Sequence, residues 1–140
     1  MGKTTYEVSN ESIEAAYNCL MIQGISEAKG HLRIAIDNAM KVIEVDKQRT
    51  LLNYCTYLCQ QAGFLDYALE AIQSVLRIDQ EANLASKNIQ NDLLTYGNIQ
   101  VNLGNLPKAL GAFEKALDIC LAQNDFADAA SCSTNLGYIF

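Results

Sequence analysis

The sequence predicts an all-α fold in which helices come in pairs and the pairs stack on one another. Helical periodicity dominates the 140 residues, and no segment shows the strict alternation expected of a half-buried strand. Small and large apolar residues also recur at a spacing of about forty residues, which indicates a repeated unit. The single proline and the low aromatic content favour helices as well.

Seven amphipathic segments are predicted, and residues that break helices separate them. The segments are 11–23, 26–44, 48–62, 65–78, 82–103, 106–122 and 126–140. The breaks fall at Gly24, at Gly63, at Gly104 and at the pair Asn124 and Asp125. Residues 1–10 are expected to form a flexible N-terminus, and residues 11–140 a single repeat domain.

The sixth segment has the clearest start signal. Asn105 precedes it and is a typical N-cap residue, because its side chain can accept a hydrogen bond from a free backbone N–H. Pro107 falls in the first turn, where the N–H that proline lacks has no helical partner in any case.

The repeat emerges when the chain is compared with itself. Gly63 and Gly104 lie 41 residues apart, and three columns of core positions share nearly the same step. The columns are Ala28, Ala68 and Ala109; Leu32, Ile72 and Phe113; and Ala35, Val75 and Ala116. Each unit is thus a helix pair, and since one pair cannot bury its own apolar face, the pairs are expected to stack. In the first unit Gly24 lies four residues before Ala28 rather than five, so its register is ambiguous by one residue.

The best-formed unit resembles the tetratricopeptide repeat (TPR). Its pattern is Leu93-x2-Tyr96-Gly97, then Gly104, then Ala109-x3-Phe113-x2-Ala116. The resemblance covers nearly the whole chain after Glu11. It implies an α-α superhelix, or solenoid, of about three helix-turn-helix repeats plus one extra C-terminal helix. Because the step is about forty residues, the chain resembles the long-helix subclass seen in kinesin light chains and some peptide-responsive bacterial regulators. It departs from the family pattern in lacking the proline that usually closes a unit, since Gln80 and Leu121 hold those places.

The resemblance implies a protein-interaction scaffold or adaptor. In this family the first helix of each pair lines a concave groove that holds peptides. The matching positions here are Thr50, Asn53, Tyr57 and Gln60; then Asn91, Leu94, Asn98 and Val101; then Ser131, Thr134 and Tyr138. Side-chain amides can bond an extended peptide in both directions, and tyrosine offers flat contact area at low entropic cost. We expect a neutral groove that binds a peptide or partner helix, the alternative being a solvated surface without a ligand.

A second functional reading is a peptide-responsive regulatory domain, in which the bound peptide changes the curvature of the array and so controls a fused or associated effector. A chaperone-binding role is disfavoured. Members with that role clamp a C-terminal carboxylate with lysine and arginine, whereas the matching positions hold Asn53, Asn91, Thr95, Ser131 and Asn135.

Composition argues against nucleic acid and membrane partners, which leaves the protein or peptide partner that the resemblance implies. The net charge is -6 and the basic residues are scattered, which argues against nucleic acid. No apolar run approaches the length of a membrane span, and the N-terminus lacks the core of a secretory signal. The five cysteines are odd in number and form no CxxC pair, so reduced thiols and a cytoplasmic location are expected.

No catalytic or cofactor site is predicted, and the chain is expected not to be an enzyme. Cys55 and Cys59 have a spacing that could clip a metal, but both fall on interior positions and read better as buried apolar residues. His31 is the single histidine and has no recognisable nucleophile to activate. The stretch Gly2-Lys3-Thr4-Thr5 lacks the upstream glycine of a phosphate-binding loop.

The sequence stops within the first helix of a further unit. Leu136, Ile139 and Phe140 would therefore lack the partner helix that normally covers such a face. We expect a fragment of a longer array; self-association through this uncapped helix is the alternative.

Overall fold

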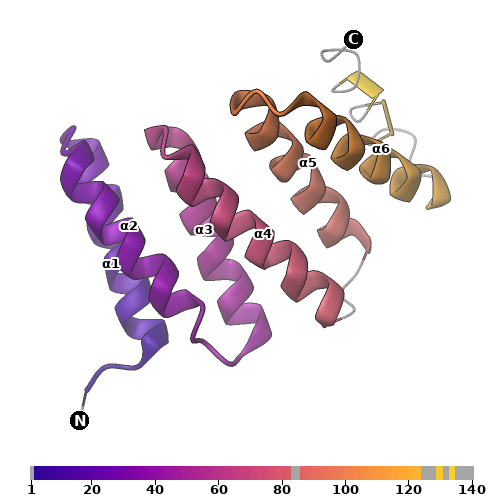
Figure 1. The fold of residues 1–140 in the computed structure, drawn as a ribbon. Coiled ribbons are helices and arrows are strands. Elements are labelled where there is room, and N and C mark those ends of the chain that lie inside the picture. Colours follow the sequence, from indigo (N-terminus) through magenta and orange to yellow (C-terminus); the bar gives the residue numbers. More distant parts are fainter. Residues whose placement is uncertain (1, 83–85, 124–128, 131–132, 135–140) are drawn as a thin grey trace. The chain divides into compact units, whose positions relative to one another are not determined.

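The computed structural model describes residues 2–82, 86–123, 129–130 and 133–134, which contain six helices (Figure 1). The helices are α1 (Thr5–Met21), α2 (Ile25–Ala39), α3 (Val45–Ala62), α4 (Leu65–Glu81), α5 (Ser86–Asn102) and α6 (Leu106–Ala122). None of the described residues forms a strand, and the helices pack in pairs, so the predicted fold class is confirmed. The predicted seventh segment, 126–140, lies almost wholly outside the described residues.

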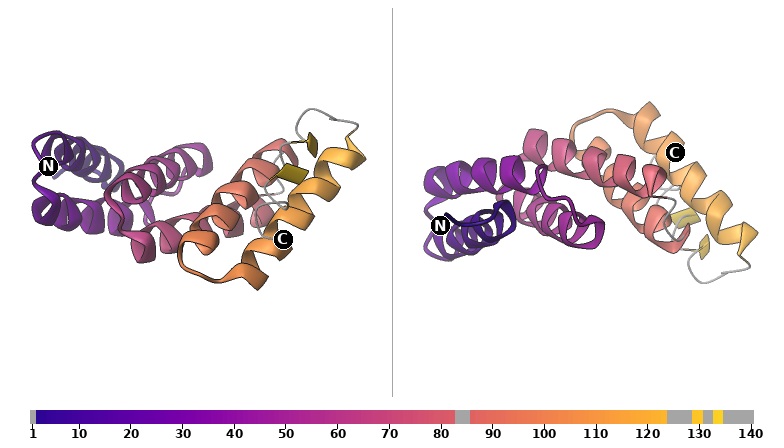
Figure 2. Two further views of the ribbon diagram at one scale, coloured as in Figure 1. Left: turned by 90° about the horizontal axis from the view of Figure 1, so that it is seen from above. Right: turned by 90° about the horizontal axis from the view of Figure 1, so that it is seen from below.

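The chain divides into two compact units, Met1–Ile78 and Asp79–Phe140. In the first unit, α1 packs against α2 and also against α3, while α2 contacts α3. Helices α3 and α4 run side by side and antiparallel, as both Figure 1 and Figure 2 show. In the second unit, α5 packs against α6.

The helix boundaries reproduce the predicted period. Helices α1, α3 and α5 begin at Thr5, Val45 and Ser86, which are 40 and 41 residues apart. Helices α2, α4 and α6 repeat the same two steps. The three predicted columns of core residues are buried throughout, and no member is more than 1% exposed. Alanines in two of these columns let the helices approach closely, while Leu32, Ile72 and Phe113 fill the space between them.

The turn between the paired helices is the same in the second and third pairs. Gly63 and Gly104 both adopt a left-handed backbone, with φ of 83° and 82°. The N–H of the following residue, Phe64 or Asn105, then donates to a carbonyl five residues back, at 2.8 Å in each case. This hydrogen bond satisfies a carbonyl that the end of the helix would otherwise leave free. Glycine is favoured at the left-handed position because it has no β-carbon to clash with the backbone.

In the first pair the left-handed position of this turn is not a glycine. Its identity resolves the one-residue ambiguity in how the first unit aligns with the later ones. Gln23 is the left-handed residue, with φ of 62°, and the N–H of Gly24 donates to the carbonyl of Cys19 at 2.7 Å. Gln23 is therefore the counterpart of Gly63, and it lies five residues before Ala28, as Gly63 lies before Ala68.

The first helix begins at Thr5, whereas the sequence pattern predicted a start at Glu11 with residues 1–10 flexible. Thr4 is the N-cap residue: its Oγ1 accepts a hydrogen bond from the N–H of Glu7 at 3.1 Å and contacts the Glu7 carboxylate. Threonine followed three residues later by glutamate is a known start signal for helices, which the prediction overlooked.

Helix α2 ends at Ala39, five residues before the predicted end at residue 44. The side-chain amide of Gln48 donates to the carbonyls of Ala39 and Met40, at 3.2 and 3.0 Å, and so satisfies groups that a continuing helix would have bonded. Val42 is buried although it lies outside the helix. Its apolar side chain continues the helical pattern of buried positions, and the prediction therefore extended the helix past it. The other boundaries lie within four residues of the prediction.

The start of α6 is confirmed in position but not in its hydrogen bonding. Asn105 is the N-cap residue and Pro107 lies in the first turn, as predicted. The Asn105 side chain does not cap the helix, however, because its Nδ2 donates to Oε1 of Gln100 at 2.9 Å.

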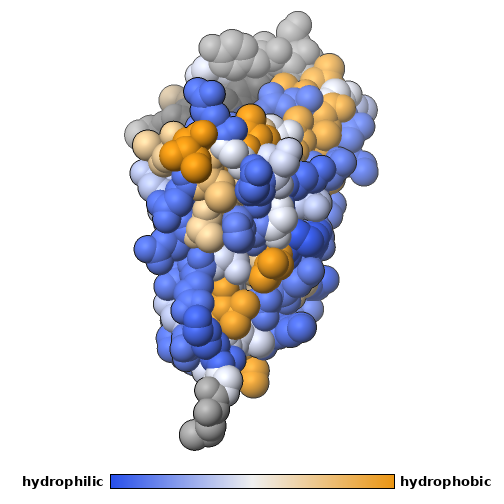
Figure 3. Space-filling model, turned by 90° about the vertical axis from the view of Figure 1, so that its left-hand side faces the viewer, coloured by the Kyte–Doolittle hydropathy of each residue, from blue (hydrophilic) through white to orange (hydrophobic). Residues whose placement is uncertain are grey.

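The outer face of α1 and α2 carries only small hydrophobic groups separated by hydrophilic surface (Figure 3). Large apolar side chains exposed near the turn between these helices include Met21, Ile22 and Ile25. No helix that the structure describes is both long and apolar enough to span a membrane.

Candidate functional site

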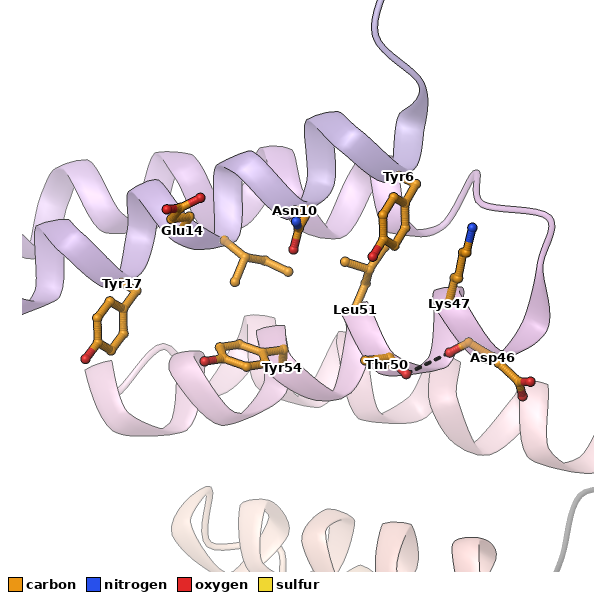
Figure 4. Close-up of a pocket in the computed structure, with 10 residues that line it drawn as sticks. Tyr6, Asn10, Glu14, Tyr17, Asp46, Lys47, Thr50, Leu51 and Tyr54 are labelled. Atoms are coloured by element: carbon orange, nitrogen blue, oxygen red, sulfur yellow. Dashed lines mark hydrogen bonds between the residues drawn. The ribbon is translucent and has the colours of Figure 1, made fainter.

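A cleft of about 440 Å³ lies between α1 and α3 in the first unit (Figure 4). We call it the tyrosine cleft, and its lining residues are Tyr6, Asn10, Ile13, Glu14, Tyr17, Asp46, Lys47, Thr50, Leu51 and Tyr54. Because α1 and α3 are the first helices of successive pairs, the cleft lies on the surface that the register assigned to ligand contact.

The floor of the cleft is apolar and its walls are aromatic. Ile13 and Leu51 are only 6% and 4% exposed, and they close the space between the two helices. Tyr6, Tyr17 and Tyr54 are 36%, 47% and 51% exposed, so a large part of each side chain is open to a ligand. Figure 4 shows Tyr6 and Tyr17 descending from α1 and Tyr54 lying along α3 across from them.

Charged groups at the cleft are arranged unevenly. Lys47 Nζ lies 5.1 Å from the centre of the Tyr6 ring and 3.1 Å from Oε2 of Glu44. Asp46 and Glu14 are exposed carboxylates at opposite ends of the cleft (Figure 4). The hydroxyl of Thr50 donates to the backbone carbonyl of Asp46 at 2.8 Å, a helical hydrogen bond that leaves the Asp46 carboxylate untouched.

The predicted residues of α3 lie beside the tyrosine cleft. A second, more open hollow along α3 is lined by Arg49, Thr50, Asn53, Tyr54 and Tyr57, and it shares Thr50 and Tyr54 with the cleft. The structure thus brings the predicted Thr50, Asn53 and Tyr57 together on one surface. Gln60 is half-buried and lines neither hollow.

The predicted residues of the second unit are less uniform. Asn91, Asn98 and Val101 are exposed on α5. Leu94 is partly buried and packs against the cluster formed by Ala116, Cys120 and Ala129 in the unit's own core.

Of the last group of predicted residues, Thr134 is exposed, and its hydroxyl donates to the carbonyl of Ala130 at 2.9 Å. Ser131 and Tyr138 lie outside the described residues.

The contribution of α1 was missed from the sequence. Asn10, Ile13 and Tyr17 line the cleft, and they lie 40 residues before the predicted Thr50, Asn53 and Tyr57. Subtracting one repeat from those positions would have found them.

The cysteine pair of α3 is buried, as predicted. Cys55 and Cys59 are both 0% exposed, and desolvation raises the pKa of each thiol to about 12. Among the described residues there is no group of three or more histidine, cysteine, aspartate or glutamate side chains that could hold a metal ion. His31 lies on α2 and is half-buried.

Comparisons with known proteins identify the fold but not a family. No protein-family model and no curated relative matches the sequence. Among the solved structures that match, two have a TM-score of 0.66 each. One is BtubC (BKLC) from P. vanneervenii, at 19% identity over 96% of this chain and 64% of that one. The other is the N-terminal domain of stress-induced protein-1 (STI-1) from C. elegans, at 11% identity over 99% of this chain and 98% of that one.

The likeness to these structures shows a helical repeat fold, and the match to the STI-1 domain, which is of the TPR type, is consistent with a TPR-like arrangement. The chain spans less than two thirds of the length of the BtubC structure. At these identities the likeness concerns the fold alone, and function has to be argued from the site.

Proposed function

We propose that the chain is a protein-interaction module of the long-helix TPR type, which binds a peptide or partner helix in the tyrosine cleft and along the adjoining surface of α3. The observation that carries the proposal is the grouping of three half-exposed tyrosines over an apolar floor, between the first helices of two successive pairs. Adaptor and scaffold roles follow from such binding.

The chemistry of the cleft suits a peptide. Burying a tyrosine ring against a ligand removes a large apolar area from water while its hydroxyl keeps a polar partner, and tyrosine is accordingly enriched at binding surfaces. Exposed aromatic groups that stand together are uncommon on surfaces that bind nothing. The amides of Asn10 and Asn53 lie at the same surface and could bond the backbone of an extended ligand.

The proposal is one of binding rather than catalysis, and it calls for a protein or peptide partner and no cofactor. It also favours a reducing compartment such as the cytosol, because Cys55 and Cys59 are free thiols enclosed in the core rather than paired for export.

Selection from a phage-displayed library of random 12-residue peptides tests the proposal. We expect the purified chain to enrich peptides whose affinity falls at least about tenfold in the variants Tyr17→Ser and Tyr54→Ser, since each removes an aromatic contact of hot-spot size. Ile43→Ser is the matched control, because Ile43 is 92% exposed and lines neither hollow. Circular dichroism checks that every variant is folded. Selected peptides that bind the tyrosine variants as tightly as the wild type would rule out the cleft as the binding site.

A further inference from the structure

We propose that the tyrosine cleft selects peptides that carry an arginine next to an apolar residue, with the guanidinium held by Tyr17, Tyr54 and Glu14. This inference rests on the proposed function and specifies the ligand of the same site. It follows from the difference between the two ends of the cleft.

One end of the cleft already contains a cation. Lys47 extends beside Tyr6 there, with Nζ 5.1 Å from the ring centre, and Glu44 pairs with it at 3.1 Å (Figure 4). A tyrosine ring attracts a cation through its quadrupole, and a nearby carboxylate attracts the same cation through an ion pair. At this end the Tyr6 ring therefore already has a cation from within the chain, and Lys47 also supplies positive charge near the exposed Asp46.

The other end has the same components without the cation. Figure 4 shows the hydroxyl of Tyr54 directed from α3 towards Tyr17 of α1, and Glu14, which also lines the cleft, lies three residues before Tyr17 on α1. In the part of the chain that the structure describes, no lysine or arginine lies over the ring of Tyr17 or Tyr54, and none pairs with Glu14. Two half-exposed rings and Glu14 thus line this end of the cleft, and no lysine or arginine among the described residues pairs with that carboxylate.

A tyrosine ring, a carboxylate and a cation occur together elsewhere in the first unit. Arg33 of α2 lies 4.9 Å from the centre of the Tyr67 ring. Its guanidinium donates to both carboxylate oxygens of Glu70, at 2.6 and 2.9 Å, and to Asp37 at 2.7 Å. This cluster provides an internal example of the arrangement that we propose for a ligand at Glu14.

Arginine suits the site better than lysine does. A guanidinium is planar, so it can lie flat on a tyrosine ring and still donate two parallel hydrogen bonds to a carboxylate. Lysine offers a compact charge that can satisfy only one of these contacts well. An apolar residue beside the arginine would cover Ile13 and Leu51, the two buried apolar residues that line the cleft. The net charge of -6 also favours the approach of a basic ligand.

The test uses the tightest peptide from the library selection, synthesised with arginine, with lysine and with citrulline, a neutral near-isostere of arginine. Isothermal titration measures each peptide against the wild type, Glu14→Gln and Glu114→Gln. Glu114 is exposed on α6 and does not line the cleft, so its variant removes the same charge elsewhere.

We expect selected peptides to share an arginine flanked by an apolar residue. Replacing the peptide's arginine with citrulline should weaken its binding to the wild-type chain roughly tenfold, the size of effect typical of a charge-assisted hydrogen bond. The Glu14→Gln variant should bind the arginine peptide more weakly than the wild type by a similar factor, but its affinity for the citrulline peptide should be unchanged. Glu114→Gln should have less than about a twofold effect, since exposed charges at a distance are screened by salt.

Three results would overturn the inference. If the tightest peptides lack arginine, or if Glu14→Gln leaves the arginine peptide unaffected while Tyr54→Ser abolishes its binding, the inference fails and the proposed function stands. If no selected peptide depends on Tyr17 or Tyr54, both fail together.

Discussion

Gly97 of α5 lies directly against the ring of Phe113 of α6. A β-carbon built at residue 97 would fall 2.8 Å from both Cδ1 and Cζ of that ring, which is closer than real β-carbons come to other atoms. Phe113 is 1% exposed and is the largest fully buried side chain among the described residues. The ring and the missing side chain therefore fit each other, and together they set how closely α5 and α6 approach.

We expect Gly97→Ala to destabilise the protein by about 1–3 kcal/mol, the usual cost of forcing an extra methyl group into a packed core. Urea unfolding followed by circular dichroism measures the change. Gly111→Ala is the matched control: it lies in α6, nothing stands within 4 Å of the added methyl, and it should stabilise by about 0.5–1 kcal/mol. Phe113→Leu should recover part of the loss in the Gly97→Ala background. Equal stability of Gly97→Ala and wild type would refute the close contact.

Replacing the left-handed residue at the first turn with glycine is expected to stabilise the protein. Gln23 adopts φ of 62° where the later pairs have Gly63 and Gly104. We expect Gln23→Gly to raise the free energy of unfolding by up to about 1 kcal/mol, because glycine adopts this conformation without a steric penalty. Gly63→Ala should lower it by a similar amount, and no atom near Gly63 would otherwise oppose the methyl group. Thermal melts check both variants, and a destabilised Gln23→Gly would show that its side chain has another role.

The ion pair between Arg33 and Glu70 ties α2 to α4. Its two hydrogen bonds are short, but the side chains are 31% and 46% exposed, so solvent screening limits their contribution. We expect a double-mutant cycle with Arg33→Met and Glu70→Gln to give a coupling of about 0.5–1 kcal/mol in low salt. The coupling should shrink in 1 M NaCl. A coupling that is unchanged by salt would contradict an electrostatic origin.

The buried thiols of α3 predict a pH dependence of stability. Burial raises the pKa of Cys55 and Cys59 from 9.0 to about 12, so between these values the unfolded chain loses protons that the folded chain keeps. Stability is therefore fully present below pH 9 and is lost as the pH rises above it, by up to about 1.4 kcal/mol per pH unit for each thiol. Urea unfolding between pH 8 and pH 10.5 measures this slope. The double variant Cys55→Ala and Cys59→Ala should have a shallower slope, and an identical slope would refute the assignment.

The same burial predicts the order of thiol labelling. Only the thiolate reacts with a disulfide reagent, and a pKa near 12 leaves roughly a thousandfold less thiolate at pH 8 than the ordinary value does. We expect Cys19, which is half-exposed, to react well before Cys55 and Cys59. Mass spectrometry after timed labelling identifies the residues, with the urea-unfolded chain as the control for complete reaction. Prompt labelling of Cys59 in the folded protein would contradict its burial.

The fold could be predicted from the sequence because it depends on patterns that repeat. The spacing of Gly63 and Gly104, with the three columns of alternating small and large residues, already specifies where helices turn and which faces they bury. These are local preferences and periodic packing, which do not require knowledge of distant contacts. The boundaries that were missed depended on single side chains, such as Thr4 at the start of α1 and Gln48 at the end of α2.

The sequence by itself thus determined the helix pairs, their forty-residue step and the buried core. Only the tertiary structure decided which exposed residues meet. Tyr17 and Tyr54 lie 37 positions apart, and no local pattern says that they face one cleft or that Glu14 stands beside them while Lys47 is already paired with Glu44. The reason is physical: a core position is marked by its own apolar side chain, whereas a binding site is formed by exposed residues whose proximity arises only when α1 packs against α3.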